Sequence, residues 1–344
     1  MNKKIIAAAV AAACVAGAPA AQAEIKVYSQ VQFELTDTDA DGAANDTMRV
    51  TDNQRGRLGV KGGHDLGGGL KSFAIAEFDF VGGNQDAEFG RGDRGDIGGK
   101  GGDDEGNGFR VREINAGLKG GFGSIALGTV KSAYKYYGGV KYDPFVTTQL
   151  EARGQGMTGS TSGHNGFLNN AFVYTNKFGM ANLHITYSLD DTDRDGGGEN
   201  NDDGELSAGL KFGNKTWEAG VAIYDEGVSD SSVSQSNTKL FGKMKFGNST
   251  VLAQYEDADD GSAVNPSTEY IWLGYQLKMG KGMLNAQYAM VDPDGNNNDR
   301  DMITVGYIHK FNKKTRIFAG YQTVDYDVNT SDVDQLSVGI RVDI

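Results

Sequence analysis

The chain is built from sixteen short segments in which apolar residues occupy every second position. In one of them, Trp217, Ala219 and Val221 alternate with Glu218 and Gly220. A period of two over about ten residues is typical of a β-strand with one apolar face and one polar face. The segments lie at 25–35, 53–63, 69–82, 110–119, 122–130, 168–178, 180–190, 204–213, 215–226, 238–247, 249–257, 268–279, 282–291, 300–312, 314–326 and 332–344.

The connections between these segments are alternately short and long. Each even-numbered segment runs into a connection of roughly one to five residues that is rich in Gly, Asn and Lys, as in tight hairpin turns. This strict alternation places every tight turn at one end of the sheet and every long loop at the other, so we predict an up-and-down antiparallel meander. The long polar loops lie at 36–52, 83–109, 131–167, 191–203, 227–237, 258–267, 292–299 and 327–331.

The number of strands decides which way the apolar face points. A closed barrel of about sixteen strands is too wide for side chains to fill, so an apolar interior would enclose a void, whereas a polar interior holds water. Strands of about ten residues tilted by about 45° span a bilayer, and closure leaves no unpaired edge in lipid. We therefore predict an all-β fold, a 16-stranded antiparallel transmembrane β-barrel whose apolar face meets lipid.

A repeated phrase marks the short turns. Lys-Phe-Gly begins at Lys177, Lys211 and Lys245, with looser copies at Lys278 and Lys310, so the steps between these lysines are 34, 34, 33 and 32 residues. Each step holds a strand, a long loop, a second strand and a turn. We predict a periplasmic hairpin turn at each copy, with the phenylalanine at the membrane interface and the glycine closing the turn.

The first 23 residues resemble a secretory signal peptide. Lys3 and Lys4 supply the positive region, residues 5–16 the apolar region, and Ala21-Gln22-Ala23 a cleavage site of small residues. This pattern is typical of an exported protein. We therefore expect residues 1–23 to be removed on the way through the periplasm, and the only cysteine of the chain to be removed with them.

The remaining residues, 24–344, are predicted to form one barrel domain. The full chain holds 33 basic and 46 acidic residues, a net charge of −13, and loss of the signal peptide makes the mature chain more negative. Such an acidic chain repels nucleic acid, which argues against that partner. No mature stretch offers the ~18 apolar residues that a membrane helix needs, and without cysteine no disulfide or thiolate metal site is available.

Two phrases carry a resemblance to a known family. They are RGRLGVKGGHDLGGGLKSF, from Arg55 to Phe73, and REINAGLKGGFGSIALGT, from Arg112 to Thr129. Over the whole mature chain the sequence resembles the Gram-negative general porins. The resemblance implies a homotrimer of barrels in the outer membrane, in contact with lipopolysaccharide. Each barrel would pass small hydrophilic solutes and ions through a pore narrowed by its inward-folded third loop, 131–167.

The resemblance also implies where the pore is narrowest. Arg57 matches the arginine of the family's Arg-Leu-Gly phrase, and Arg112 matches the arginine that precedes Gly-Leu-Lys; Arg55 shares a face with Arg57. We expect this basic wall to face Asp143 and Glu151 of the third loop across water. The alternative is that these arginines form structural salt bridges within the lumen.

The sequence departs from the family where more basic residues often stand. Gln30 and Thr175 are neutral, which thins the basic wall. Most surplus carboxylates lie in the long loops, so we expect a negative outer mouth and a modest cation preference that weakens as salt rises. These loop carboxylates include Asp37, Asp39, Asp41, Asp103, Asp104, Glu105, Asp191, Asp193, Asp195, Asp202, Asp203, Asp259 and Asp260.

Two acidic loops contain Asp-x-Asp-x-Asp-Gly, the start of an EF-hand calcium loop. The full loop needs a carboxylate at position twelve. Counted from Asp37 this position is Met48, so the match fails, and counted from Asp191 it is Asp202, but strands flank the loop. A solvated loop is the first interpretation, and weak Ca²⁺ or Mg²⁺ binding that bridges to lipopolysaccharide is the second. The candidate ligands are Asp191, Asp193, Asp195 and Asp202.

Catalysis has little support in the sequence. The four histidines are scattered over a turn, a loop and two strands, and no Gly-x-Ser-x-Gly, His-Glu-x-x-His or phosphate-loop motif occurs. The prediction is a channel with no cofactor rather than an enzyme; a barrel-borne hydrolase and a secreted calcium-binding adhesin are the alternatives. The family usually ends in phenylalanine, and we expect that the apolar Ile344 serves here.

Overall fold

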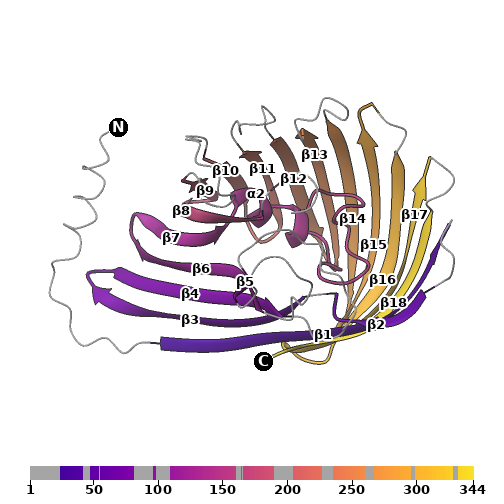
Figure 1. Cartoon of the computed structure of the whole chain (residues 1–344), viewed down its shortest axis with the longest axis horizontal. Coiled ribbons are helices and arrows are strands. Elements are labelled where there is room, and N and C mark those ends of the chain that lie inside the picture. The colour runs from indigo at the N-terminus through magenta and orange to yellow at the C-terminus, as the bar shows by residue number, and fades with distance from the viewer. Residues whose placement is uncertain are drawn as a thin grey trace.

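The predicted segments form consecutive strands of one antiparallel sheet in the computed structural model (Figure 1). The strands are β1 (Glu24–Ala40), β2 (Thr47–Thr51), β3 (Gly56–Gly67), β4 (Leu70–Phe80), β5 (Asp96–Ile97), β6 (Phe109–Gly120), β7 (Gly123–Lys131), β8 (Phe167–Phe178), β9 (Ala181–Ser188), β10 (Leu206–Gly213), β11 (Trp217–Asp225), β12 (Ser236–Phe246), β13 (Ser249–Asp259), β14 (Thr268–Met279), β15 (Gly282–Pro293), β16 (Arg300–Lys310), β17 (Thr315–Tyr326) and β18 (Val333–Asp343).

The structure describes residues 24–41, 47–53, 55–80, 96–97, 109–159, 164, 166–189, 204–226, 235–259, 267–295, 299–327 and 332–344. The predicted signal peptide lies outside these residues. So do several loop carboxylates, among them Asp103, Asp104, Glu105, Asp203 and Asp260. Among the described residues, no helix has the length and apolar character needed to cross a bilayer.

The sheet closes on itself through β1. One edge of β1 pairs with β18, where Leu35 lies opposite Val338, and the other edge pairs with β3, where Val27 lies opposite Val60. β2 also pairs with β1 and extends the line of β3, and β5 is a two-residue pair beside β6. The other sixteen strands form the wall, so the predicted antiparallel barrel is confirmed.

The two faces of the wall differ as the period of two predicted. On β18, Leu336, Val338 and Ile340 are about half exposed, whereas Gln335 and Ser337, at the alternate positions, are buried inside the barrel. Apolar residues stay outside because lipid, not water, surrounds them.

At the end of β18, the backbone of Ile344 exchanges two hydrogen bonds with Ser29 of β1. Whether an apolar Ile344 suffices for assembly stays a prediction.

The Lys-Phe-Gly copies are hairpin turns, although not all in the same way. Gly179, Gly247 and Gly280 have φ near +60°, a left-handed conformation that glycine adopts without a steric cost. In the copy at Lys211, the glycine stays within β10. There the side chain of Asn214 closes the turn by accepting hydrogen bonds from the backbone N–H groups of the residues two and three positions on.

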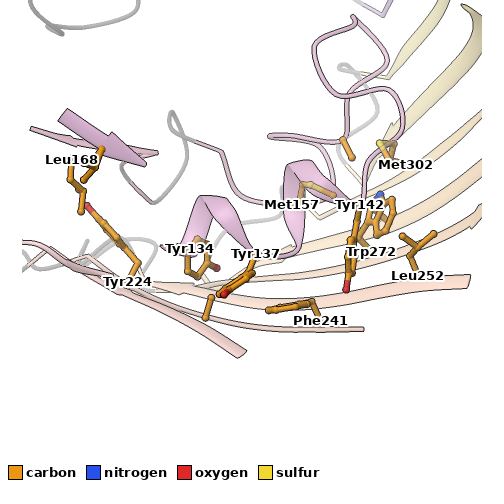
Figure 2. Packing of buried hydrophobic residues seen from close by; sticks show 14 of the residues in the cluster. Tyr134, Tyr137, Tyr142, Met157, Leu168, Tyr224, Phe241, Leu252, Trp272 and Met302 are labelled. Carbon is orange, nitrogen blue, oxygen red and sulfur yellow. The ribbon is translucent and has the colours of Figure 1, made fainter. Parts of the chain in front are cut away.

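The inner face is not polar throughout. Beneath the third loop, inward positions of β11 to β17 carry large apolar side chains that pack with the loop (Figure 2). Trp272 of β14 is fully buried there, and its indole N–H donates to Gln287 at 3.0 Å. The inward apolar residues include Tyr224, Phe241, Leu252, Trp272, Met302, Phe318 and Val324. They replace a water-filled lumen on this side of the barrel by a packed core.

We expect Trp272→Ala to lower the thermal stability of the folded barrel. Removing a buried tryptophan leaves a cavity under the third loop and costs about 3–5 kcal/mol. The measurement is the temperature at which the compact barrel band is lost on a detergent gel. Ile271→Ala, which removes a neighbouring side chain from the lipid face, is the control and should shift this temperature much less. Equal shifts for the two variants would contradict a packed core under the loop.

Candidate pore constriction

The third loop folds into the barrel, as predicted. It leaves β7 through Ser132, which caps the short helix α2 (Ala133–Tyr136), and continues through the 3-10 turn η1 (Gly139–Lys141) inside the wall (Figure 1). Farther along, side chains of the opposite wall bond to it. Gln322 donates to the carbonyl of Leu150 at 3.1 Å, and Arg300 donates to that of Gly154 at 2.6 Å. The loop therefore crosses the lumen.

Buried polar contacts add to the apolar packing that holds the loop against the wall. The hydroxyl of Tyr134 donates to Glu256 of β13 at 2.7 Å, and Thr158 also donates to this carboxylate. The ammonium group of Lys239 lies 3.8 Å from the centre of the Tyr134 ring. Since all of these groups are buried, the start and the end of the loop are held against β12 and β13, and the middle of the loop extends to the side of β1 to β6.

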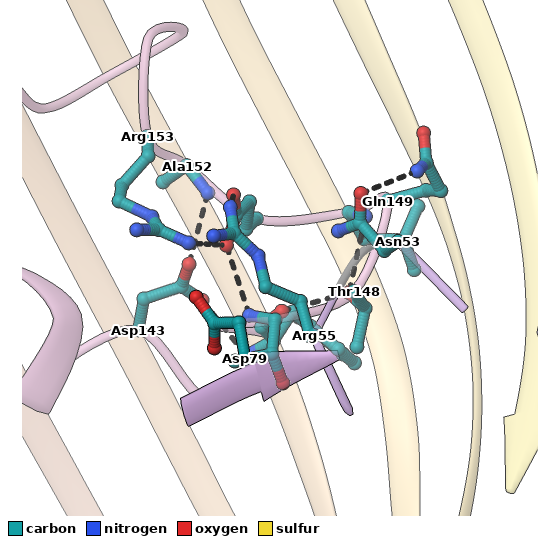
Figure 3. Close-up of polar contacts among 12 residues, drawn as sticks. Asn53, Arg55, Asp79, Asp143, Thr148, Gln149, Ala152 and Arg153 are labelled. Carbon is teal, nitrogen blue, oxygen red and sulfur yellow. Dashed lines mark hydrogen bonds and ion pairs between the residues drawn. The ribbon is translucent and has the colours of Figure 1, made fainter. Parts of the chain in front are cut away.

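The tip of the loop touches the wall on that side directly (Figure 3). Arg55 donates to Glu151 at 2.7 Å, and Arg153 donates to the same carboxylate at 2.5 Å. Burial alone would raise the pKa of Glu151, but the two guanidinium groups lower it to about 2. The sequence had suggested that Arg55 and Glu151 face each other across water, and the structure instead joins them in an ion pair.

Asp143 lies elsewhere in the loop. Its carboxylate accepts hydrogen bonds from the backbone N–H groups of Phe145 at 2.8 Å and Ala152 at 2.9 Å, and from the side chain of Gln287 at 2.9 Å. Burial raises its pKa to about 6. Asp143 thus ties two parts of the loop together and binds β15; it does not contact the predicted basic wall.

Arg112 faces the lumen because of a β-bulge in β6. Glu113 lies opposite Glu77 and Val111 opposite Phe78, so Arg112 is an extra residue in the pairing of β6 with β4. A bulge changes the direction of the following side chains. This explains why Arg112 points inward although it has the same parity as lipid-facing residues farther along the strand.

Two carboxylates that the sequence analysis did not single out lie beside Arg112. Arg112 donates to Glu77 at 2.9 Å and to Asp79 at 3.0 Å, and Arg110 donates to Asp79 at 2.7 Å. Glu77 and Asp79 stand two positions apart on β4, so their spacing could have placed both on one face. The alternative of structural salt bridges therefore holds for Arg112 and Arg55.

Arg57 has a different environment from the other two arginines. Among the described residues, no carboxylate lies within ion-pair distance of it, and its buried Nε has no hydrogen-bond partner. Lys141 of the loop lies close enough that burial, Lys131 and Arg57 together lower the pKa of Lys141. The positive charges of Arg57 and Lys141 thus lie close together, and Lys141 is a residue that the sequence analysis missed. Lys131 lies nearby but is paired with Glu113 at 2.6 Å.

The remaining candidate residues have separate roles. Gln30 donates to the carbonyl of Arg55 at 3.2 Å, next to the constriction. Thr175 pairs with Ser124 of β7 and His184 of β9 in the sheet.

The metal candidates Asp191, Asp193, Asp195 and Asp202 lie outside the described residues. The residues within the described ranges contain no metal-binding group of His, Cys, Asp and Glu. Divalent binding stays a prediction.

We expect the contact between Glu151 and Arg55 to survive mild acid. The pKa of Glu151 is depressed to about 2 from an ordinary value of 4.5, so its stabilising effect is complete above about pH 4.5 and is lost as the pH falls through about 2. Single-channel conductance should therefore show no transition near pH 4.5 and should change near pH 2 to 3, whereas protonation of Asp143 acts separately, near pH 6. A transition centred near pH 4.5 would show that this carboxylate is not paired.

Comparison with known proteins agrees with the fold. Residues 7–329 match the sequence model of a family described as Gram-negative porin. Outer membrane porin protein 32 of Delftia acidovorans is 28% identical over 342 residues, which cover 93% of this chain and 88% of that protein.

Solved structures give the same result for the fold. The anion-selective porin from Comamonas acidovorans aligns with a TM-score of 0.74 at 19% identity, over 94% of this chain and 100% of that one. OmpT of Vibrio cholerae, in its trimer form, aligns with a TM-score of 0.66 at 16% identity, over 94% and 99%. The chain belongs to the Gram-negative porin family.

Proposed function

We propose that this outer-membrane protein is a water-filled channel for the passive diffusion of small hydrophilic solutes and ions, and that it catalyses no reaction. The observation that supports this most is the path of the third loop. The loop is anchored at both ends to β12 and β13 and crosses the lumen, and its tip contacts Arg55. It narrows the barrel without filling it, and charged side chains from the wall line the space that is left.

The balance of charge at the constriction favours anions. Glu77, Asp79 and Glu151 are each bonded to an arginine, so their negative charge is compensated locally. Arg57 and Lys141 have no carboxylate within ion-pair distance among the described residues. The charge available to a permeating ion at the narrowest point is therefore positive.

We therefore propose a modest anion preference, in place of the cation preference that the loop carboxylates suggested. The described loop carboxylates lie far from Arg57: Arg57 pairs with Gln30 of β1, and Asp37 lies seven residues farther along that strand, which is about 23 Å at ~3.3 Å per residue. Charges more than about 10 Å away are largely screened at 0.1 M salt. The related porin from Comamonas acidovorans, described as anion-selective, has the same fold and is consistent with this proposal.

Assembly as a homotrimer is part of the proposal. The trimer form of OmpT from Vibrio cholerae supports it, since the two barrels share one architecture. Crosslinking of the purified protein in mild detergent should give a ladder that ends at three subunits. A protein that stays monomeric while it still forms channels would contradict the trimer alone.

A planar-bilayer recording with a salt gradient tests the channel and its selectivity together. We expect stepwise conductance increases and a reversal potential whose sign corresponds to anion preference at about 0.1 M salt, where the Debye length is ~10 Å. At about 0.01 M salt the Debye length grows to ~30 Å, and the outer carboxylates should weaken this preference. The absence of conductance would overturn the channel; cation preference at 0.1 M would overturn the role given to Arg57.

A further inference from the structure

The lysines of the repeated turn phrase point into the lumen. Phe178, Phe246 and Met279 are more than half exposed on the lipid face. Since side chains alternate along a strand, the lysine before each of them faces inward, at the periplasmic end of the barrel. Other strands add lysines at the same height and on the same face. We call the set the vestibule lysines: Lys61, Lys119, Lys177, Lys245, Lys278 and Lys310, all exposed.

The carboxylates at this end of the barrel form ion pairs with other basic residues and not with the vestibule lysines. Asp65 pairs with Lys71 at 3.5 Å. Glu218 accepts from Lys211 at 3.0 Å and from Lys243 at 3.1 Å. At the end of β18, Asp343 pairs with Arg341 at 2.9 Å. Glu24 at the start of β1 and the terminal carboxylate are the other acids of this end in the described chain, so the vestibule lysines outnumber the free negative charges.

The opposite end of the barrel has the opposite charge. Carboxylates stand at the loop-side ends of successive strands, where Asp257 lies opposite Glu269 and Asp301 opposite Asp325. The chain as a whole is acidic, with a net charge of −13, yet its periplasmic mouth is basic. The side chains of these four carboxylates alternate with buried inward residues such as Tyr270 and Met302, so they lie on the outer face of the wall. A permeating ion therefore meets a positive inner mouth, in addition to the charges at the constriction.

We propose that the vestibule lysines form a binding site for soluble multivalent phosphates at the periplasmic mouth. Their ammonium groups are exposed to water on flexible side chains, and several of them can surround one anion that carries three or more negative charges. A monovalent anion gains little from such an arrangement, because one charge interacts with each ammonium only weakly in water. The site makes the channel sensitive to multivalent anions from the periplasmic side and not from outside.

The proposal rests on the channel function above and is tested by side-specific block. Inorganic tripolyphosphate is added to one chamber and then to the other, at about 0.1 M KCl, where the screening length is ~10 Å. We expect block of the single-channel current from one side at a concentration at least about tenfold lower than from the other. Raising the KCl concentration to about 1 M, where the Debye length is ~3 Å, should abolish the difference.

A variant identifies the residues responsible. The fourfold change Lys177→Gln, Lys245→Gln, Lys278→Gln and Lys310→Gln should raise the half-blocking concentration on the sensitive side about tenfold and remove the asymmetry. The matched control, Asp65→Asn with Lys71→Gln, removes an ion pair at the same end without changing the net charge. This control should keep the asymmetry of the block. If the fourfold variant does not assemble, Lys278→Gln with Lys310→Gln should give a partial rise, of about threefold.

The outcomes separate this inference from the proposed function. Conductance steps with equal block from both sides, or a variant as sensitive as the unmodified protein, would overturn the site and leave the channel intact. A protein that gives no conductance before tripolyphosphate is added would overturn the channel and this inference together.

Discussion

Replacing Arg57 by glutamine is expected to reduce the anion preference and to increase the conductance. Arg57 faces the lumen without a carboxylate within ion-pair distance in the described part of the chain, so its charge is less compensated than that of Arg55 or Arg112 and acts on permeating ions. A unit charge about 5 Å from an ion in water contributes about 0.8 kcal/mol, which is roughly fourfold in favour of an anion and roughly fourfold against a cation, so the anion-to-cation permeability ratio changes by up to about sixteenfold. The shorter, neutral side chain also widens the constriction.

The control for this prediction keeps the charge. Arg57→Lys should preserve the permeability ratio, because an ammonium group at this position acts on the same ions, although its shape differs. Reversal potentials measured across a salt gradient compare the three proteins. If Arg57→Gln and Arg57→Lys had the same permeability ratio, the charge of Arg57 would not contribute to selectivity.

Replacing Glu151 by glutamine should release the tip of the third loop. Arg55 and Arg153 share this carboxylate, and both arginines are largely buried. Removing one partner of a buried ion pair costs about 3–5 kcal/mol, because the remaining charge is left without compensation. We expect a lower melting temperature of the folded barrel and a larger, noisier single-channel current.

A matched carboxylate on the outside of the barrel serves as the control. Glu269 accepts a hydrogen bond from Tyr255 at 2.9 Å on the lipid face, so Glu269→Gln removes one charge far from the lumen. It should leave both the current noise and the conductance unchanged. If the current noise of Glu151→Gln channels were as low as that of Glu269→Gln channels, the apolar packing against the wall alone would hold the loop.

The strands could be predicted well from the sequence because their signal is local. β14 matches its predicted bounds, 268–279. The strand predicted at 53–63 is longer in the structure, because β3 runs to Gly67 and the chain before it, after a short interruption, forms β2. Alternation of apolar and polar residues is a property of each strand, since lipid on one side and the lumen on the other act on every residue separately. The main exception is the apolar inner surface around Trp272, which is explained only by the loop that covers it.

The charged site could be predicted in part. Glu151 of the third loop meets the predicted basic wall at Arg55, whereas Asp143 binds the loop backbone and β15. No spacing rule shows that Glu77 would neutralise Arg112, because the contact depends on the register of β4 against β6 and on the bulge at Arg112. The partners of a charge lie on other strands, so its effect on ions follows from the assembled barrel.

The sequence by itself determined the barrel, its sixteen strands, the end at which the turns lie and the family to which the chain belongs. The barrel, its strand number and the placement of its turns follow from a period of two and from the lengths of the connections, both of which act over a few residues. The family follows from the resemblance carried by two phrases, Arg55 to Phe73 and Arg112 to Thr129. Only the tertiary structure decided which side of the lumen the third loop covers, which arginines are neutralised and which remain available to ions. Those features depend on contacts between residues far apart in the chain, such as Arg55 with Glu151 and Tyr134 with Glu256, because burial and ion pairing are set by neighbours in space.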